Sequence, residues 1–443
     1  MGCMRCGQKS PWQRLVHRLQ ELSWKKTLKE RSREIYSSIF RRTKPVTVVL
    51  EIVLVIVAGL LLVLTSPSGL DLKVYREGGL ALLHNPSSLY DAILGPVGDP
   101  GLPFTYPPFA ALIFVPIAIM PFWAAFVLSI LISIVAVLYV SKDLSERIVA
   151  KWPKLESYVT TVTVSSLLLV SGPFRDTIWY GQINILIFAA CYLTFVKCKS
   201  LAPFVVVVGI FAGIKLTPIA FLILPFAMKK WRALIIGVTT FFGTQLVGWL
   251  VSPHNTVHYW SDVVRDPTRV GRIGYLDNVS IQAVLERAGQ SQAVWFVIAL
   301  IVGLSFVGLL WRIAPYTDRV TLLGIASACP VLVSPVSWSH HWVWWPIIAL
   351  GWITLAQKAP SVVKYTIWVV TTLSTTALFF APKAISLAFG VFPDEEIVPM
   401  WGYIAPTLPV LANMICLYLS FAVRSQVLAS EVGIDNFDRE LAT

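Results

Sequence analysis

The sequence predicts an all-α polytopic membrane protein, and its composition and its apolar runs carry that prediction. Hydrophobic residues make up 56% of the 443 residues, charged residues make up 14%, and the mean hydropathy is +0.71. Soluble domains carry about 25% charged residues, so this composition excludes an ordinary soluble fold. Apolar runs recur along nearly the whole chain, and several reach the roughly 20 residues that a helix needs to cross a bilayer core.

The positive charge is concentrated before the first apolar run. Residues 1–45 hold 12 Lys and Arg against 3 Asp and Glu, which is +9 of the net +12. With Trp12, Leu15, Leu19 and Leu22 at helical spacing, the segment is expected to form a cytoplasmic amphipathic helix on anionic membrane lipids. A nucleic-acid partner is not expected in such a chain. Cys3 and Cys6 lack the second ligand pair that a zinc site requires, so we expect free thiols.

Twelve spans are predicted within residues 46–424, with both termini in the cytoplasm. They lie at about 46–65, once within 109–140, and at 156–171, 183–197, 201–214, 216–228, 232–252, 293–311, 319–335, 341–357, 362–381 and 403–423. A single crossing within 109–140 leaves the basic loops on the inner side, as the positive-inside rule requires. Residues 66–106 and 253–292 are then outer loops, with short helices expected in them, and residues 425–443 are a cytoplasmic tail.

This topology gathers polar residues of the apolar region on the outer face. They are Asp71, Arg175, Asp176, Tyr180, Gln182, Lys215, Asn278, Gln282, His340 and His341. Polar and ionisable groups at membrane depth usually mark a pathway or a site. We therefore expect a functional site on this face, with the loop 253–292 covering it.

Asp71 lies a few residues after the first span, in the segment Asp71-Leu-Lys-Val-Tyr75. A carboxylate at that point would deprotonate an acceptor hydroxyl at the bilayer surface. A helix cap or a solvated loop acid explains Asp71 equally well. Tyr75 and Tyr106 would stack on a sugar face, although anchoring at the membrane interface is the commoner use of such tyrosines.

Two further segments interrupt the apolar runs with polar residues. In the segment from Arg175 to Asn184, the side chains of Gln182 and Asn184 would form hydrogen bonds with sugar hydroxyls. The alternative is a salt-bridged turn with a polar cap on the next span. Lys215 separates two short apolar runs. A cation at a broken helix suits an anionic phosphate, and snorkelling to the interface is the alternative.

Residues 334–345 combine two histidines with four tryptophans. His340 and His341 would hold a phosphate, and Trp338 and Trp342 a sugar ring. The alternative is a set of interfacial tryptophans with chance histidines. Adjacent histidines on a helix point about 100° apart and seldom chelate one metal ion together, so no metal site is predicted.

The sequence lacks a Walker motif, a kinase motif set and a nucleophile elbow. The cytoplasmic loops are also too short to house a nucleotide-binding domain. A nucleotide-sugar donor is therefore not expected, and no cofactor is predicted.

Five segments together resemble a known family. They are residues 71–75, 104–108, 181–184, 213–218 and 335–342, and their order and spacing resemble the GT-C membrane glycosyltransferases, specifically glycosyltransferase family eighty-seven. The resemblance spans about residues 46–423 and implies a GT-C-like bundle. Its closest likeness is to polyprenyl-phosphate-mannose-dependent α-1,2-mannosyltransferases that extend phosphatidylinositol mannosides or branch lipomannan.

The resemblance implies transfer of mannose from a polyprenyl-phosphate donor to a lipid-anchored mannoside on the outer face of the plasma membrane. On this interpretation Asp71 is the base of a single inverting displacement. The donor phosphate is bound by Lys215, His340, His341 and Arg175. Sugar and acceptor are bound by Tyr75, Tyr106, Gln182, Asn184, Asn278, Trp338 and Trp342.

Three rival functions remain open at this point. An arabinofuranosyltransferase would use the same kind of donor, and an O-antigen-type ligase or polymerase also takes polyprenyl donors. A secondary transporter or lipid flippase would explain the broken helices and the intramembrane cations. An enzyme should place Asp71, Lys215 and the histidines around one cavity, whereas a transporter should show an alternately accessible path near the membrane midplane.

Overall fold

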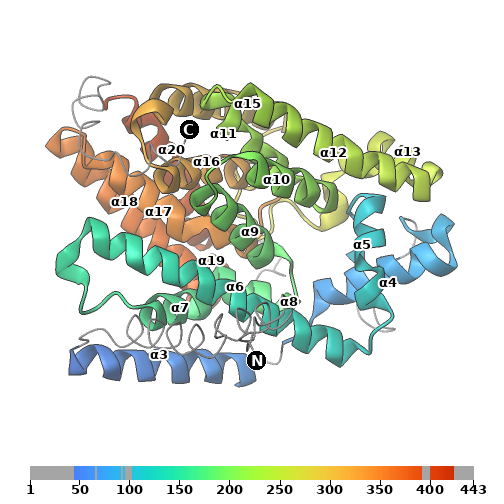
Figure 1. Ribbon diagram of the computed structural model, residues 1–443, viewed down its shortest axis with the longest axis horizontal. Coiled ribbons are helices and arrows are strands. Elements are labelled where there is room, and N and C mark those ends of the chain that lie inside the picture. The colour runs from blue at the N-terminus through green and yellow to red at the C-terminus, as the bar shows by residue number, and fades with distance from the viewer. Residues whose placement is uncertain (1–43, 65–66, 91–92, 95–101, 392–399, 424–443) are drawn as a thin grey trace, which may run out of the picture.

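The computed structural model describes residues 44–64, 67–90, 93–94, 102–391 and 400–423, and this part of the chain is predominantly helical (Figure 1). This helical content agrees with the helical membrane protein predicted from the sequence. The α-helices are α3 (Pro45–Leu64), α4 (Leu70–His84), α5 (Pro108–Ala118), α6 (Phe122–Lys151), α7 (Thr161–Val170), α8 (Gly172–Tyr180), α9 (Asn184–Lys197), α10 (Ala202–Ile214), α11 (Ile223–Ala227), α12 (Trp231–Val251), α13 (Pro253–Ser261), α14 (Ile281–Arg287), α15 (Gln292–Ile313), α16 (Arg319–Val333), α17 (Trp345–Ala356), α18 (Ser361–Phe380), α19 (Pro382–Ala388) and α20 (Ile404–Ser420).

Short elements connect these helices. A two-residue antiparallel hairpin joins β1 (Ile93–Leu94) to β2 (Leu102–Pro103), with Ile93 opposite Pro103. The 3₁₀ turns are η1 (Pro86–Ser88), η2 (Pro153–Leu155), η3 (Thr217–Leu222), η4 (Val263–Arg265), η5 (Pro267–Val270), η6 (Ala314–Tyr316), η7 (Ser339–Trp344) and η8 (Met400–Tyr403).

Five helical segments of the described chain are long and apolar enough to cross a membrane. They are Phe122–Lys151, Trp231–Val251, Gln292–Tyr316, Ser361–Phe380 and Trp401–Ser420. The first predicted span is α3, with 20 residues, and most of the other predicted spans appear as shorter apolar helices, such as α10 with 13 residues. At 1.5 Å per residue such a helix covers about 20 Å of a bilayer core of about 30 Å.

The apolar run 109–140 is interrupted at Met120-Pro121 in the sequence, and the structure divides it there into α5 and α6, because Pro121 has no backbone N–H to continue a helix. Three other predicted boundaries were wrong. Helix α6 then continues past residue 140 to Lys151, and the ion pair between Asp143 and Arg147 one turn apart stabilises that extension. The predicted span 341–357 becomes the 3₁₀ turn η7 and the shorter helix α17, and the predicted span 216–228 becomes η3 and α11.

Helix α16 forms the centre of the bundle, and nearly all of its residues are buried. It packs closely against α17, because a Cβ on Gly324 would lie 2.0 Å from the carbonyl oxygen of Ile347. Helix α3 lies along one edge of the molecule against α7 (Figure 1), where Glu51 accepts hydrogen bonds from Thr160 and Thr163. Helices α4 and α5 pack together at another side of the molecule.

The terminal segments of the sequence lie almost entirely outside the described residues. The predicted amphipathic helix within residues 1–45 and the predicted tail 425–443 both fall there, as do Cys3 and Cys6. These remain predictions from the sequence.

Candidate active site

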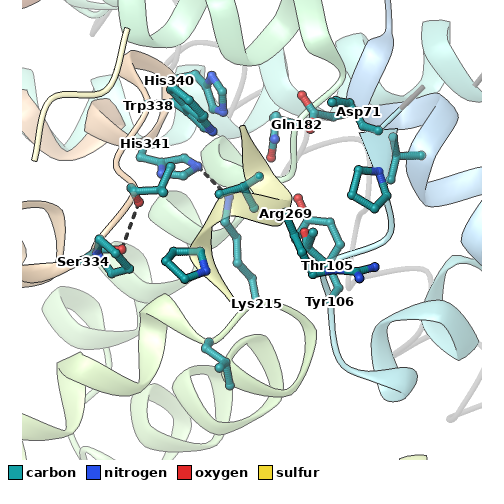
Figure 2. A pocket seen from close by; sticks show the side chains of 18 of the residues that line it. Asp71, Thr105, Tyr106, Gln182, Lys215, Arg269, Ser334, Trp338, His340 and His341 are labelled. Carbon is teal, nitrogen blue, oxygen red and sulfur yellow. Dashed lines mark hydrogen bonds between the residues drawn. The ribbon is translucent and has the colours of Figure 1, made fainter. Parts of the chain in front are cut away.

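The main cavity of the described chain has a volume of about 530 Å³ and is bounded by segments far apart in the sequence. They are the start of α4, residues 102–107, the turn between α8 and α9, the break after α10, residues 259–277, residues 334–341 and α19. Seven of the predicted site residues line this cavity, as Figure 2 shows for all of them: Asp71, Tyr106, Gln182, Lys215, Trp338, His340 and His341.

Asp71 occupies the first turn of α4 and faces the cavity. The residue before this helix, Gly69, has φ 58°, and the first backbone N–H of the helix, that of Leu70, donates to the Ser68 hydroxyl at 3.3 Å rather than to Asp71. The helix-cap explanation of Asp71 is therefore not supported. Burial raises the pKa of the Asp71 carboxyl to about 6, although the nearby Lys215 charge and a hydrogen bond from Gln182 oppose that rise. A carboxyl with such a pKa is suited to general-base chemistry near neutral pH.

Gln182 reaches Asp71 because α8 ends against α4. Gly181 terminates α8 with φ 68°, and a Cβ at this position would lie 2.7 Å from the Cβ of Leu72. The backbone N–H of Gly69 donates to the carbonyl of Trp179 at 2.8 Å and fixes the other side of this junction. Glycine at 181 therefore permits both the left-handed backbone and the close approach.

Tyr75 lies behind this junction rather than in the cavity wall. It is 2% exposed, and its ring stacks on Phe114 with 4.3 Å between ring centroids. Its hydroxyl donates to Oε1 of Gln182 at 2.7 Å and lies 3.4 Å from the hydroxyl of Tyr106. Since Oε1 of Gln182 accepts from Tyr75, the amide NH₂ group is left to face Asp71. Tyr75 thus supports Gln182, and its predicted contact with sugar does not match this position.

Lys215 is located at a true helix break, as the sequence predicted. It ends α10 with an extended backbone (φ −142°, ψ 121°), and the chain resumes as the 3₁₀ turn η3. Its Nζ donates to Oδ1 of Asn184 at 2.9 Å and lies 3.1 Å from Nε2 of His341. An ammonium group has no acceptor, so His341 accepts at Nε2 and carries its proton on Nδ1.

Asn184 supports this arrangement from outside the main cavity. Besides accepting from Lys215, it donates through Nδ2 to the backbone carbonyl of His340 at 2.9 Å. It lines a small neighbouring cavity instead of the main one. Its side chain therefore links the lysine to the histidine segment, and it does not reach the space predicted for sugar.

His340 and His341 are adjacent in sequence but differ in environment. Both lie in the 3₁₀ turn η7, and their rings meet edge to face with centroids 4.8 Å apart. His340 is 5% exposed, and among the described residues neither of its ring nitrogens has a hydrogen-bond partner. Burial and the Lys215 charge hold the pKa of His340 well below its usual value. A neutral, unpartnered imidazole therefore lines the cavity.

Three further predicted site residues, besides Tyr75 and Asn184, do not line the cavity. Arg175 pairs with Asp176 at 3.3 Å and lies over the ring of Trp179. Asn278 is fully buried, and its Oδ1 accepts from the backbone of Ser337 at 2.9 Å. Trp342 is also fully buried and donates through Nε1 to the Val279 carbonyl. Hydropathy places such residues on one face of the membrane, but it does not show which way each side chain points.

Other lining residues were not assigned to the site from the sequence. They include Tyr180, Arg269, Tyr275, Asp277 and Lys383. Burial and the neighbouring Asp176 raise the pKa of Asp277 to about 7. Asp277 lies in the loop that was expected to cover the site, so its general location was predictable. Lys383 follows an apolar run and a proline, which resembles the setting of Lys215 and was the available signal.

A metal site does not emerge from the part of the chain that the structure describes. Within it, no group of three or more His, Cys, Asp or Glu residues is placed to hold a metal ion.

Comparison with known proteins identifies the class. The model of Glycosyltransferase family 87 matches residues 104–335, just over half of the chain. The polyprenol-phosphate-mannose-dependent alpha-(1-2)-phosphatidylinositol pentamannoside mannosyltransferase of Mycolicibacterium smegmatis is 33% identical over 315 residues, covering 70% of this chain and 75% of that protein. The protein of the same name from Mycobacterium tuberculosis is 31% identical over 321 residues, 71% of this chain and 73% of that protein.

A second group of relatives has a slightly different name. A polyprenol-phosphate-mannose-dependent alpha-(1-2)-phosphatidylinositol mannoside mannosyltransferase of M. smegmatis is 27% identical over 321 residues, 67% of this chain and 72% of that protein. No solved structure matches the chain significantly.

These findings and the apolar helices define a membrane glycosyltransferase. The chain belongs to glycosyltransferase family 87. The resemblance noted in the sequence is therefore confirmed. The matched range 104–335 includes Gln182 and Lys215, whereas Asp71, His340 and His341 lie outside it.

Proposed function

We propose that this protein transfers mannose from polyprenyl-phosphate-mannose to a hydroxyl of a lipid-anchored mannoside and forms an α-1,2 linkage. The observation that carries this proposal is the cavity itself, which brings Asp71 together with Lys215, His340 and His341. The relatives of up to 33% identity are named as polyprenol-phosphate-mannose-dependent enzymes acting on phosphatidylinositol mannosides, and this supports the donor, the linkage and the class of acceptor.

The reaction we propose is a single displacement. The acceptor hydroxyl oxygen attacks the anomeric carbon and gives its proton to Asp71. The bond between the anomeric carbon and the phosphate oxygen breaks, and its electron pair leaves with polyprenyl phosphate. One displacement converts a β-linked donor into an α-linked product, so a single acid at the reacting carbon suffices.

Lys215 is proposed to neutralise the departing phosphate. The leaving group is already stable as an anion, so it needs a fixed positive charge more than it needs a proton. Asn184 and His341 hold the Lys215 ammonium in place through contacts of 2.9 and 3.1 Å. A group fixed in this way requires little reorganisation as negative charge develops on the phosphate.

The membrane topology is part of the proposal. We place the cavity at the outer face of the plasma membrane, with about twelve spans in a GT-C-like bundle and both termini in the cytoplasm. The positive-inside distribution of the loops supports this orientation. The apolar helices that are shorter than a full crossing would then leave room for the polar cavity near one membrane surface.

The rival functions fit the observations less well. Asp71, Lys215 and both histidines line one cavity, which is the arrangement expected of an enzyme rather than of a carrier. The curated relatives described above carry the name mannosyltransferase, so an arabinofuranosyl donor and a ligase or polymerase reaction have less support.

The test is an assay of the purified full chain with polyprenyl-phosphate-mannose and a panel of phosphatidylinositol mannosides and lipomannan. Mass spectrometry should show one added hexose on at least one acceptor, and digestion with a linkage-specific α-mannosidase should remove it. Transfer from a polyprenyl-phosphate-arabinofuranose donor without transfer of mannose would overturn the proposal.

A further inference from the structure

The cavity has a second acidic region that the displacement mechanism does not use. Asp277 lines this region, and its backbone carbonyl accepts a hydrogen bond from the N–H of Ser339 at 3.0 Å. Lys383, which lines the same cavity, donates to the hydroxyl of Tyr275 at 2.8 Å. The ring of Tyr275 in turn meets Trp338 edge to face at 6.0 Å. A carboxylate, a lysine and aromatic faces thus line one part of the cavity.

His340 lines the same cavity and lacks partners. Its ring contacts that of Tyr180 at 5.4 Å between centroids, and Tyr180 and Asp277 both line the cavity. Burial, together with the negative charge of Asp277, raises the pKa of the Tyr180 phenol. Within the described residues both nitrogens of His340 are buried and unpartnered. Leaving such groups unpaired costs free energy, so a ligand that pairs them is the simplest reason for their presence.

We propose that Asp277, His340 and Tyr180 form a subsite that binds the hydroxyls of a sugar ring. The proposal rests on the proposed function and adds a recognition role for Asp277, which nothing in the reaction itself requires. It also changes the role of His340 from binding phosphate to binding a sugar hydroxyl.

The chemistry of these groups favours a sugar over a phosphate. A carboxylate repels a phosphate but accepts hydrogen bonds from hydroxyls. A neutral imidazole offers one donor and one acceptor, which matches a hydroxyl that both accepts and donates, whereas a phosphate dianion offers acceptors alone. The rings of Tyr275 and Trp338 provide apolar faces for the C–H side of a sugar. The cationic pole at Lys215 remains for the phosphate.

The occupant is a sugar ring of either the donor or the acceptor, and steady-state kinetics distinguish the two. Asp277→Asn and His340→Phe should each raise KM for one of the two substrates by roughly 10- to 100-fold, as expected for loss of hydrogen bonds to a ligand, with kcat within about threefold. Asp262→Asn is the matched control, because Asp262 is an exposed acid of the same loop and does not line the cavity. Its KM values should not change.

Monodeoxy analogues provide the decisive comparison. The wild-type protein should discriminate strongly against the donor or acceptor analogue that lacks the bound hydroxyl, and Asp277→Asn should lose most of that discrimination. His340→Phe should fold at least as well as wild type, since it replaces unpaired buried nitrogens with an apolar ring. Unchanged KM values for both substrates in both variants, or a loss confined to kcat, would overturn the subsite.

These outcomes are separable from failure of the proposed function. If the wild-type protein transfers mannose and the variants keep both KM values, the subsite is wrong and the function stands. If the wild-type protein transfers no mannose, the subsite is tested by calorimetry, with polyprenyl-phosphate-mannose and phosphatidylinositol mannoside titrated separately into the protein in detergent. Binding of either ligand weakened tenfold or more by Asp277→Asn would then support the subsite, and unchanged binding of both ligands would refute it.

Discussion

Two carboxylates of this protein, Asp71 and Asp143, occupy contrasting environments. Asp143 lies on α6, and its side chain is 7% exposed. It accepts hydrogen bonds from the Tyr192 hydroxyl and from Nε of Arg147, both at 2.7 Å, and Nζ of Lys197 lies 3.2 Å away. Asp71 faces a cavity of about 530 Å³, with Gln182 and Lys215 as polar neighbours in the cavity wall.

The difference shows what separates a structural acid from a reactive one. Three donors satisfy Asp143, so its charge links α6 to α9 and is not available for chemistry. Lys215 is the cation near Asp71, but its ammonium group makes its short contacts with Asn184 and His341. Lys215 is therefore near enough to act on the same substrate as Asp71 without neutralising it. Substitutions at the two acids should have opposite consequences for activity and for stability.

The largest effect is expected from Asp71→Asn. The amide keeps the shape of the side chain but cannot accept a proton, so kcat should fall about 10²- to 10⁴-fold, the usual contribution of a general base. The melting temperature in detergent should remain within a few degrees of wild type, because burial of the Asp71 carboxylate is unfavourable and few contacts offset that cost. Near-normal transfer rates by this variant would exclude Asp71 as the base.

Lys215→Ala should have the next largest effect. Loss of the fixed charge at the phosphate should lower kcat/KM for the donor about 10²- to 10³-fold, as removal of electrostatic stabilisation typically does. The KM for the acceptor should stay within about threefold. Lys230→Ala is the control, since Lys230 is exposed at the start of α12 and does not line the cavity. A defect that follows acceptor concentration instead would remove Lys215 from the phosphate site.

The pH dependence of kcat/KM should report Asp71. The base acts when deprotonated, and burial has raised its pKa from 3.8 to about 6, so activity should rise with pH and level off above about 6. Below that value the rate should fall about tenfold per pH unit. Lys215, Gln182, Tyr106 and Tyr180 are the polar neighbours on the packed elements, and Gln182→Glu should move the midpoint upward by adding a like charge.

An acid limb with a midpoint near 4 would contradict this assignment. So would a Gln182→Glu profile that coincides with that of the wild type. Because both proteins would be assayed with the same donor and acceptor, ionisation of the substrates would affect the two profiles equally.

The sequence predicted the parts of the site that depend on chain order and failed on those that depend on packing. The break at Lys215 was visible because a lysine and a proline interrupt two apolar runs. The grouping of Asp71 with Lys215 and the histidines followed from loop charge, which sets the membrane side of each loop. The length and boundaries of several helices did not follow, because an apolar run does not reveal where a 3₁₀ turn such as η7 replaces an α-helix.

Side-chain direction was the second limit. Trp342 and Asn278 were predicted on the same membrane face as the cavity residues, but both side chains are buried inside the protein. In helices and turns buried on all sides the apolar periodicity that would reveal direction is lost. Asp277 and Lys383 were not assigned to the site for the same reason, since their places outside the apolar runs do not show that packing brings their side chains to the cavity.

Asp143→Asn tests the structural side of the comparison. The amide weakens contacts with two cations and a tyrosine, so the free energy of unfolding should fall by about 1–3 kcal/mol. Transfer by the folded fraction should stay within about twofold of wild type. Melting in detergent gives the first quantity, and kcat normalised to folded protein gives the second. A large loss of kcat in fully folded protein would mean that the two acids are not distinct in role.

Tyr75→Phe is expected to have the smallest effect, and it tests the hydrogen-bond chain behind Asp71. In the wild type the 2.7 Å bond from Tyr75 keeps the NH₂ group of Gln182 facing Asp71. Without this bond the amide can rotate, so its NH₂ group would face Asp71 for only part of the time. We expect kcat to fall about 3- to 10-fold, in keeping with a net hydrogen-bond contribution near 1 kcal/mol, while KM for both substrates stays constant. Tyr365→Phe, at an exposed ring on α18, is the control. A rise in KM with unchanged kcat would instead mean that Tyr75 contacts the sugar, as its place in the sequence suggested, and that the cavity opens past Gln182 when substrate binds.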